Sequence, residues 1–85
     1  MELDARRILE GTALEADICI VGAGPAGITL AREFIGHKAD VLILESGGLE
    51  PEEHIQQLNE GTVMGDPYAG LRQTRYRRLG GTVSR

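Results

Sequence analysis

The sequence contains few of the residue types that common kinds of site require. There is one cysteine, so the chain cannot form an internal disulfide. Two well-separated histidines and that cysteine do not make a typical zinc site, and we expect no bound metal. Aromatic residues make up 4% of the chain, and tryptophan is absent. The longest apolar stretch, residues 18–31, is too short to span a bilayer, and it is also interrupted by three glycines and a proline.

The charge is spread unevenly along the chain, which carries a net −4. Residues 1–71 contain four basic and thirteen acidic side chains, whereas residues 72–85 contain five arginines and no acid. A basic segment can indicate nucleic-acid binding, but the acidic remainder would repel a phosphate polymer. We therefore expect no nucleic-acid partner. The arginines are expected to lie on an exposed face, or to meet acidic side chains or a cofactor phosphate.

The start of the chain gives no sign of export. Residues 1–4 lack the basic region and the apolar core of a signal peptide. A single cysteine fits a reducing compartment, so the sequence predicts a cytoplasmic protein that does not attach to a membrane. Cys19 lies inside an apolar run, and we expect it to be a buried, unreactive thiol.

The most informative segment is residues 17–45. An apolar run at 17–22 leads into a glycine-rich turn, an amphipathic helix is predicted at 25–36, and a second apolar run occupies 40–45. A strand, a glycine-rich turn, a helix and a second strand in this order predict a βαβ unit that binds a nucleotide. A turn that is rich in glycine for structural reasons alone is the alternative, and the flanking elements disfavour it.

Each part of the glycine-rich turn has a distinct expected role. Gly22 allows the tight turn from strand to helix, Gly24 lets the backbone approach a pyrophosphate, and Gly27 lets the helix pack closely on the sheet. The pyrophosphate would meet the free N–H groups of the helix that begins near Pro25. Glu45, eighteen positions after Gly27, ends the second strand, where a carboxylate can accept hydrogen bonds from a ribose.

The helix itself has one face suited to packing on a sheet. That face is formed by Gly27, Leu30, Ala31, Phe34 and Ile35. Gly36 is expected in the left-handed conformation that ends many helices. Further along, residues 51–59 are predicted to be helical, with a thin apolar stripe at Ile55 and Leu58, and residues 61–70 to be irregular.

The two predicted strands indicate an α/β fold that is incomplete. Both strands are apolar without alternation, which is typical of parallel strands covered on both faces. One predicted helix can cover only one face. We therefore expect residues 1–85 to form part of a dinucleotide-binding domain with a βαβ core at 17–45 and no substrate domain. The remainder of an enzyme, or a partner chain, would complete the sheet.

Three motifs together resemble the FAD domain of the glucose–methanol–choline (GMC) oxidoreductases. They are the sequence GAGPAG at residues 22–27, LILESGG at 42–48 and LGGT at 79–82. Residues 14–21 also resemble the entry to that domain. The resemblance implies a Rossmann-like FAD-binding domain and a small-molecule cofactor, FAD. In this family the flavin takes a hydride from an alcohol carbon.

The resemblance also implies roles for individual residues. Contacts to the pyrophosphate are implied for Gly22, Gly24, Pro25 and Ala26. Glu45 would contact the adenosine ribose, and Ser46 would lie near the adenosine. Gly81 and Thr82 would lie toward the diphosphate and the isoalloxazine ring.

Two departures from the family limit what the resemblance implies. The family commonly continues with a glycine-rich stretch containing Trp or Asn, whereas this chain has Val83, Ser84 and Arg85. The catalytic histidine of the family has no counterpart, so we assign no catalytic residue and expect the chain to be inactive alone. Another FAD- or NAD-dependent oxidoreductase remains an alternative, because Glu45 would suit either cofactor, although the turn at Gly80–Thr82 favours FAD. A non-catalytic gene remnant or partner subunit is the other alternative.

Overall fold

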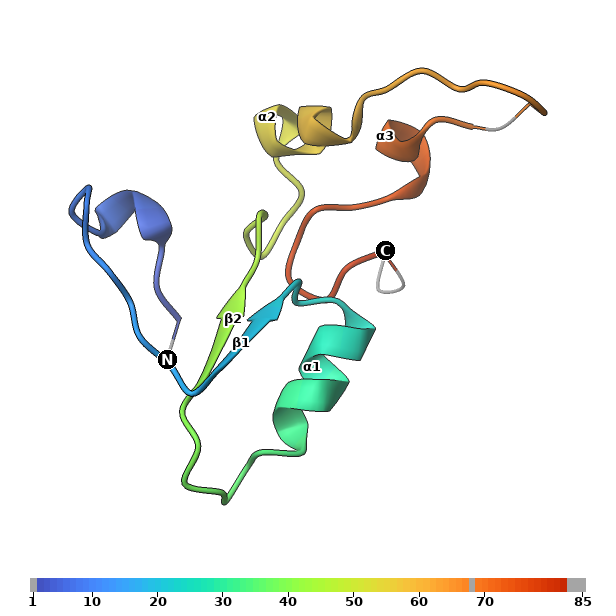
Figure 1. Ribbon diagram of the computed structural model, residues 1–85. Helices are drawn as coiled ribbons and strands as arrows, with labels where there is room; N and C mark the ends of the chain where they lie inside the picture. The colour runs from blue at the N-terminus through green and yellow to red at the C-terminus, as the bar shows by residue number, and fades with distance from the viewer. Residues whose placement is uncertain (1, 68, 83–85) are drawn as a thin grey trace.

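The computed structural model describes residues 2–67 and 69–82, so residues 83–85, where the family resemblance departs, lie outside the described part. The predicted α/β fold is confirmed. Two parallel strands, β1 (Ile18–Val21) and β2 (Val41–Leu44), form one sheet, and α1 (Pro25–Arg32) connects them as a βαβ unit (Figure 1). Each strand is one residue shorter at both ends than the predicted span.

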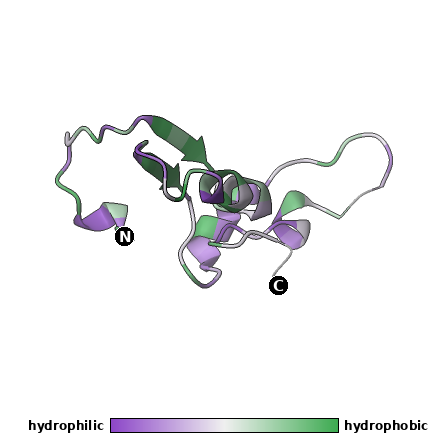
Figure 2. Ribbon diagram, turned by 90° about the horizontal axis from the view of Figure 1, so that it is seen from below, coloured by the Kyte–Doolittle hydropathy of each residue, from purple (hydrophilic) through white to green (hydrophobic). Residues whose placement is uncertain are grey.

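The register of the sheet decides which side chains meet α1. Ile20 pairs with Ile43, and Cys19 pairs with Leu42. A Cβ atom added at Gly27 of α1 would lie 3.4 Å from the side chain of Ile20, so Ile20 faces the helix. Because side chains alternate along a strand, Cys19 and Leu42 lie on the opposite face. Figure 2 shows the apolar character of both strands.

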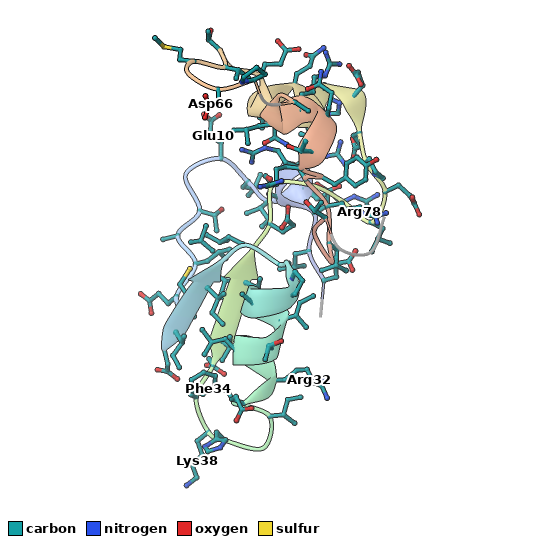
Figure 3. The ribbon with its side chains drawn as sticks, turned by 90° about the vertical axis from the view of Figure 1, so that its right-hand side faces the viewer. Glu10, Arg32, Phe34, Lys38, Asp66 and Arg78 are labelled. Carbon is teal, nitrogen blue, oxygen red and sulfur yellow. The ribbon has the colours of Figure 1, made fainter. Side chains whose placement is uncertain are left out.

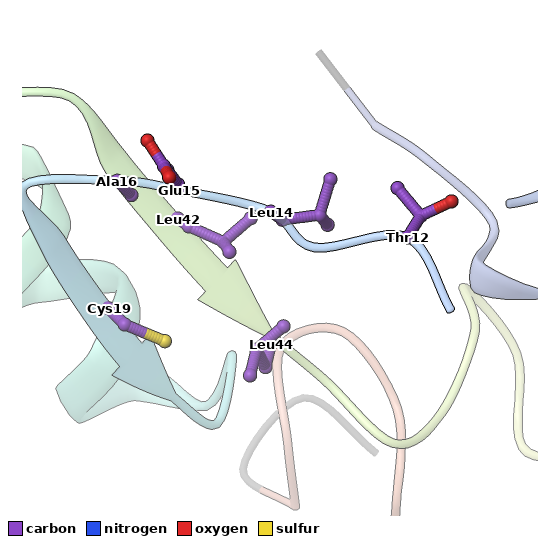
Figure 4. Close-up of a pocket in the computed structure, with 7 residues that line it drawn as sticks. All are labelled: Thr12, Leu14, Glu15, Ala16, Cys19, Leu42 and Leu44. Atoms are coloured by element: carbon purple, nitrogen blue, oxygen red, sulfur yellow. The ribbon is translucent and has the colours of Figure 1, made fainter. Parts of the chain in front are cut away.

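One face of the sheet is left bare, as the sequence predicted from its single covering helix. Ile20, under α1, is 7% exposed, whereas its neighbour Val21 is 82% exposed. The expectation that Cys19 is buried was wrong, because its thiol lies on this uncovered face and is exposed. An open cavity of about 670 Å³ lies over this face (Figure 4). Its lining residues are Thr12, Leu14, Glu15, Ala16, Cys19, Leu42 and Leu44.

The helix α1 ends four residues earlier than predicted. From Glu33 to Ile35 the backbone N–H groups bond to carbonyls three residues back, at 3.1–3.2 Å, so the last turn is tightened. Gly36 has φ +85°, which confirms the predicted left-handed glycine. The predicted packing face was partly wrong: Leu30 is 50% exposed and Ile35 is 77% exposed. Ile35 lies beyond the regular helix, which ends at Arg32.

The helical residues 53–59 and 71–74 form a second, smaller cluster beside the sheet. The predicted helical segment is confirmed as α2 (Glu53–Gln56) followed by η2 (Gln57–Asn59), and the described residues of 61–70 are irregular as expected. Two short elements were not assigned from sequence. One is α3 (Leu71–Thr74), which packs against η2, and the other is η1 (Ala5–Arg7) near the N-terminus.

The whole chain is less compact than a globular domain of its length. Its radius of gyration is 15.2 Å, against about 12 Å for a compact chain of this size. Its accessible surface is 7055 Å², against about 4,900 Å² for a folded monomer of this mass. Among the described residues only Ile20 and Ala23 are buried hydrophobic side chains. The sheet and its helix therefore make a thin core.

Candidate functional site: two glycine turns at the carboxyl ends of the strands

The glycine-rich turn between β1 and α1 adopts the conformation that its sequence predicted. Gly22 has φ +103°, a value that side chains other than glycine rarely adopt, and its N–H donates to the carbonyl of Leu44 at 2.7 Å. The turn therefore leaves the sheet at the end of β1 while still bonded to β2. A Cβ atom at Gly27 would overlap the carbonyl oxygen of Gly22. This contact confirms that Gly27 allows the close approach of the helix.

The N-terminus of α1 offers free backbone donors at this turn. Gly24 is the N-cap, Pro25 is the first helical residue, and no side chain caps the end. Ile28 is the first residue of the helix whose N–H donates to a carbonyl of the preceding turn, that of Gly24, at 3.0 Å. The N–H groups of Ala26 and Gly27 therefore have no partner within the helix. Such an end attracts anions, because the N–H groups and the helix dipole point the same way.

The second glycine turn lies directly against the first. The N–H of Gly80 donates to the carbonyl of Ala23 at 2.8 Å, and a Cβ atom at Gly81 would lie 3.1 Å from the Cα of Gly24. Gly80 and Gly81 both have positive φ, at +91° and +69°. Figure 1 shows this segment crossing the carboxyl end of β1 and the start of α1. The fold thus brings together two turns that are more than fifty positions apart in the sequence.

Thr82 contributes to the shape of its own turn. Its hydroxyl oxygen accepts a hydrogen bond from the N–H of Tyr76 at 3.0 Å. The N–H of Leu79 donates to the carbonyl of Gly48 at 2.8 Å, so the segment also contacts the loop after β2. A Cβ atom at Gly47 would overlap the carbonyl of Arg77, and only glycine permits this approach.

Glu45 lies at the end of β2 and joins the two loops. Its Oε1 accepts a hydrogen bond from the N–H of Ala23, and its Oε2 accepts one from the N–H of Gly47, both at 2.9 Å. The hydroxyl of Ser46 donates to the same Oε2 at 3.3 Å. Sequence reasoning assigned Glu45 to a ribose alone. In the structure the carboxylate accepts from a backbone N–H of the glycine-rich turn and from one of the loop after β2.

Arg77 is a residue of the site that sequence reasoning missed. Its NH1 donates to the hydroxyl oxygen of Ser46 at 2.9 Å, and its Nε donates to Oδ1 of Asn59 at 2.7 Å. In the sequence Arg77 is one of five arginines in a basic segment, and nothing there distinguishes it from the others.

Gln56 positions the segment that carries Arg77. The side chain is 8% exposed, and its Nε2 donates to the backbone carbonyls of Arg72, at 2.7 Å, and of Arg75. Its Oε1 accepts from the N–H of Arg77 at 3.2 Å. The predicted apolar stripe of this helix was partly wrong, because Leu58 is 60% exposed and the buried position is polar. A buried amide with all its partners fixes the backbone beside it.

Arg72 of the basic segment meets acidic side chains, as one of the sequence alternatives proposed, and Arg78 meets an aromatic ring. Arg72 forms ion pairs with Glu53 and with Glu60, the latter at 2.8 Å. The guanidinium of Arg78 lies 5.6 Å from the ring centroid of Tyr76. Figure 3 shows Arg78 beyond the N-terminal end of α1, whereas Arg32 lies at the opposite end of that helix.

The clearest pKa shift lies away from the two turns. Hydrogen bonds from the side chain and the backbone N–H of Arg6 lower the pKa of Asp4 from 3.8 to about 2. The same interaction raises the pKa of Arg6. Within residues 2–67 and 69–82, no cluster of histidine, cysteine and acidic side chains is arranged to bind a metal ion. None of the helices in that part of the chain is both long and apolar enough to cross a membrane.

Comparison with known proteins gives one similarity. The putrescine oxidase of Kocuria rosea is 42% identical to this chain over 43 residues. That match covers 51% of this chain but 9% of the oxidase, so the chain corresponds to a small part of that protein. No protein-family model matches the chain, and no solved structure matches it. The chain is thus similar, over half its length, to a segment of an oxidase.

Proposed function

We propose that this chain is an FAD-binding segment of a flavin-dependent oxidoreductase of the alcohol-oxidising GMC type. The observation that carries the proposal is the docking of the Gly80–Gly81 turn on the Ala23–Gly24 turn, at the carboxyl ends of both strands. Ligands of open α/β sheets bind at that edge. The similarity to an oxidase over half the chain supports the broader class of flavin-dependent oxidoreductase.

The residues of the two turns fit a dinucleotide. A Cβ atom at Gly24 would meet nothing within 4 Å, so open space lies beside the uncapped start of α1. Ala26 and Gly27 would donate their N–H groups to the pyrophosphate, with Gly22 and Pro25 shaping the turn. Glu45, with Ser46 beside it, would accept from the adenosine ribose, and Gly81 and Thr82 would lie toward the diphosphate and the ring.

When bound, the flavin supplies the hydride-accepting chemistry, and this chain's residues bind and orient the cofactor. The described residues provide backbone donors and one carboxylate at the site. They include no histidine near either turn that could act as a base toward an alcohol. The catalytic groups of such an enzyme would therefore come from residues other than those in the two turns.

A second candidate is a flavin-dependent oxidase that acts on amines. The observation that favours it is the similarity to putrescine oxidase. The glycine-rich turn and Glu45 suit either chemistry, because they contact the cofactor and not the substrate. The Gly80–Gly81–Thr82 turn favours the GMC type, since it is the motif that the resemblance places against the diphosphate.

The proposal is tested by identifying the bound cofactor and the substrate that reduces it. The protein should be expressed from its complete natural reading frame, and the released cofactor should be identified by chromatography. We expect FAD, and we expect anaerobic addition of a primary alcohol to bleach the flavin absorbance. Bleaching by putrescine but not by alcohols would favour the second candidate. A colourless protein that binds NAD and takes up no FAD would contradict both.

A further inference from the structure

We propose that Arg77 and Ser46 are positioning residues that set Glu45 to accept a ribose hydroxyl through one oxygen, Oε1. The inference rests on the proposed function. Its basis is a continuous set of hydrogen bonds, here called the Arg77 chain, which runs through Asn59, Arg77, Ser46, Glu45 and Ala23. These residues come from η2, the segment before the second turn, the end of β2 and the first turn.

The direction of each bond in the Arg77 chain follows from its chemistry. A guanidinium can only donate, so the hydroxyl oxygen of Ser46 accepts from NH1 of Arg77. The hydroxyl proton of Ser46 is then directed to another acceptor, and Oε2 of Glu45 lies 3.3 Å away. Arg77 itself is oriented by its second bond, from Nε to Asn59 at 2.7 Å. Arg77, in the segment before the second glycine turn, therefore helps to fix the rotamer of Glu45 through Ser46.

Counting acceptor positions identifies the oxygen left for a ligand. A carboxylate offers about four acceptor positions, two on each oxygen. Oε2 receives the hydroxyl of Ser46 and the N–H of Gly47, and is filled. Oε1 receives only the N–H of Ala23, so one position remains on it. That oxygen lies beside the turn that would bind the pyrophosphate, where the adenosine ribose of the same cofactor would reach it.

Arg77 is better placed for this role than for reading a phosphate. An arginine near the end of the second strand can accommodate a 2′-phosphate in NADP-binding proteins. Here two of the donor groups of Arg77 are used by the neutral side chains of Ser46 and Asn59. The open acceptor position on the Glu45 carboxylate, which a hydroxyl can fill and a phosphate cannot, favours a ribose without a 2′-phosphate, as in FAD.

The experiment compares FAD with an FAD analogue whose adenosine is 2′-deoxy, in protein expressed from the complete reading frame. In the parent protein, loss of the 2′-hydroxyl should weaken binding about tenfold or more, because the bond is to a carboxylate. In Arg77→Met and in Ser46→Ala, FAD binding should weaken and the preference for FAD over the analogue should fall below about threefold. A merely structural role would weaken both ligands equally.

Arg75→Met is the matched control. It removes the same charge two residues away, and the side chain of Arg75 bonds to the carbonyl of Thr74. We expect the parent preference in this variant. Ser46→Ala decides the question if Arg77→Met does not fold, because Ser46 is exposed and its removal leaves the Arg77–Asn59 bond intact.

Three results would overturn the proposal. Variants that bind FAD with the parent preference would refute the positioning role alone. If the parent protein bound NADP⁺ more tightly than FAD, and Arg77→Met removed this preference, the role of Arg77 would be to bind a 2′-phosphate. A parent protein that binds no FAD would remove the proposed function as well.

Discussion

At the scale of single residues, the glycines of this chain differ in what a side chain would meet. Gly27 and Gly47 lie against backbone carbonyls, so any side chain there would overlap the chain itself. Gly24 lies in open space with φ −83° and ψ −172°, which any residue can adopt. Among the residues that the structure describes, nothing requires glycine at position 24. Only a bound cofactor would require glycine at this position, so a substitution of Gly24 tests the proposed site most directly.

Gly24→Val should abolish FAD binding while the fold is retained. The branched side chain would occupy the space beside the N-terminus of α1, where the pyrophosphate is proposed to lie. Gly61→Val is the control, because a Cβ atom at Gly61 also meets nothing within 4 Å and lies away from the turns. FAD content of the purified protein is the measurement. Normal FAD content in Gly24→Val would exclude this turn as the pyrophosphate site.

Glu45→Ala should weaken FAD binding by roughly 1.5–3 kcal/mol, the range for a hydrogen bond to a charged group. The structure adds a second effect, because the N–H groups of Ala23 and Gly47 lose their acceptor. The free energy of unfolding should therefore also fall. Glu45→Gln retains a carbonyl acceptor and should lose less of both quantities. Calorimetric titration and chemical unfolding measure the two effects separately. Unchanged values in Glu45→Ala would contradict the hydrogen bonds described.

Asp4 provides a pH test that does not depend on the cofactor. Its pKa is lowered to about 2 in the folded chain because Arg6 bonds to the charged carboxylate. A lowered pKa means that this local stabilisation is fully present above about pH 4 and is lost as the pH falls through 2. An NMR titration of the Asp4 carboxyl should show the low value. Arg6→Ala should return it toward 3.8, and an unchanged titration in that variant would remove Arg6 as the cause.

At the scale of elements, the contact between β1 and α1 depends on the missing side chain at Gly27. The helix end approaches so closely that a Cβ atom would overlap the carbonyl of Gly22. The first turn of α1 therefore leaves no space for a side chain at position 27. The other face of the sheet has the opposite character, with an exposed thiol at Cys19 and an exposed Val21.

Gly27→Ala should destabilise the fold. Overpacking at a tight contact costs about 1–3 kcal/mol, and the gain in helix propensity returns up to about 1 kcal/mol. The net change is a loss of stability, together with a displaced glycine turn. Thr29→Ala is the control, because Thr29 lies on the exposed face of the same helix. Denaturant unfolding of the protein expressed from its complete reading frame measures both. A Gly27→Ala variant as stable as the parent would show that the contact is looser than described.

At the scale of the whole molecule, the described residues bury little apolar surface, and we expect this burial to be too small for a self-sufficient domain. Even a compact domain of about 60 residues buries only about 60% of its unfolded surface. This chain exposes 7055 Å², and an apolar sheet face forms part of that surface. Exposed apolar patches of this kind promote association.

We therefore expect the isolated 85-residue chain to aggregate, or to give poorly dispersed NMR signals, and to show no alcohol-dependent dye reduction. Thermal unfolding followed by circular dichroism should be broad. FAD would add stability only if the folded state already forms the site. A sharp, cooperative transition in a monomeric sample that binds FAD stoichiometrically would refute this expectation. It would instead indicate an autonomous flavin-binding module.

Much of the βαβ unit could be predicted from sequence because its signals are local. The apolar runs and the glycines at 22, 24 and 27 each act within a few residues of their neighbours, and Glu45 directly follows the second run. Element boundaries were less accurate, since the last turn of α1 tightens beyond Arg32. The exposure of Cys19 was missed, because burial of a strand depends on what covers it and not on its own composition.

The sequence by itself determined the order of the elements, the left-handed Gly36, the tight turn at Gly22 and the position of Glu45 at a strand end. Only the tertiary structure decided what Glu45 bonds to, which arginine lies beside it, and that the Gly80–Gly81 turn meets Gly24. The physical reason is that hydrogen bonds between distant segments depend on where the backbone brings them. A single buried amide, Gln56, positions the segment carrying Arg77, and its local sequence gives no sign of that role.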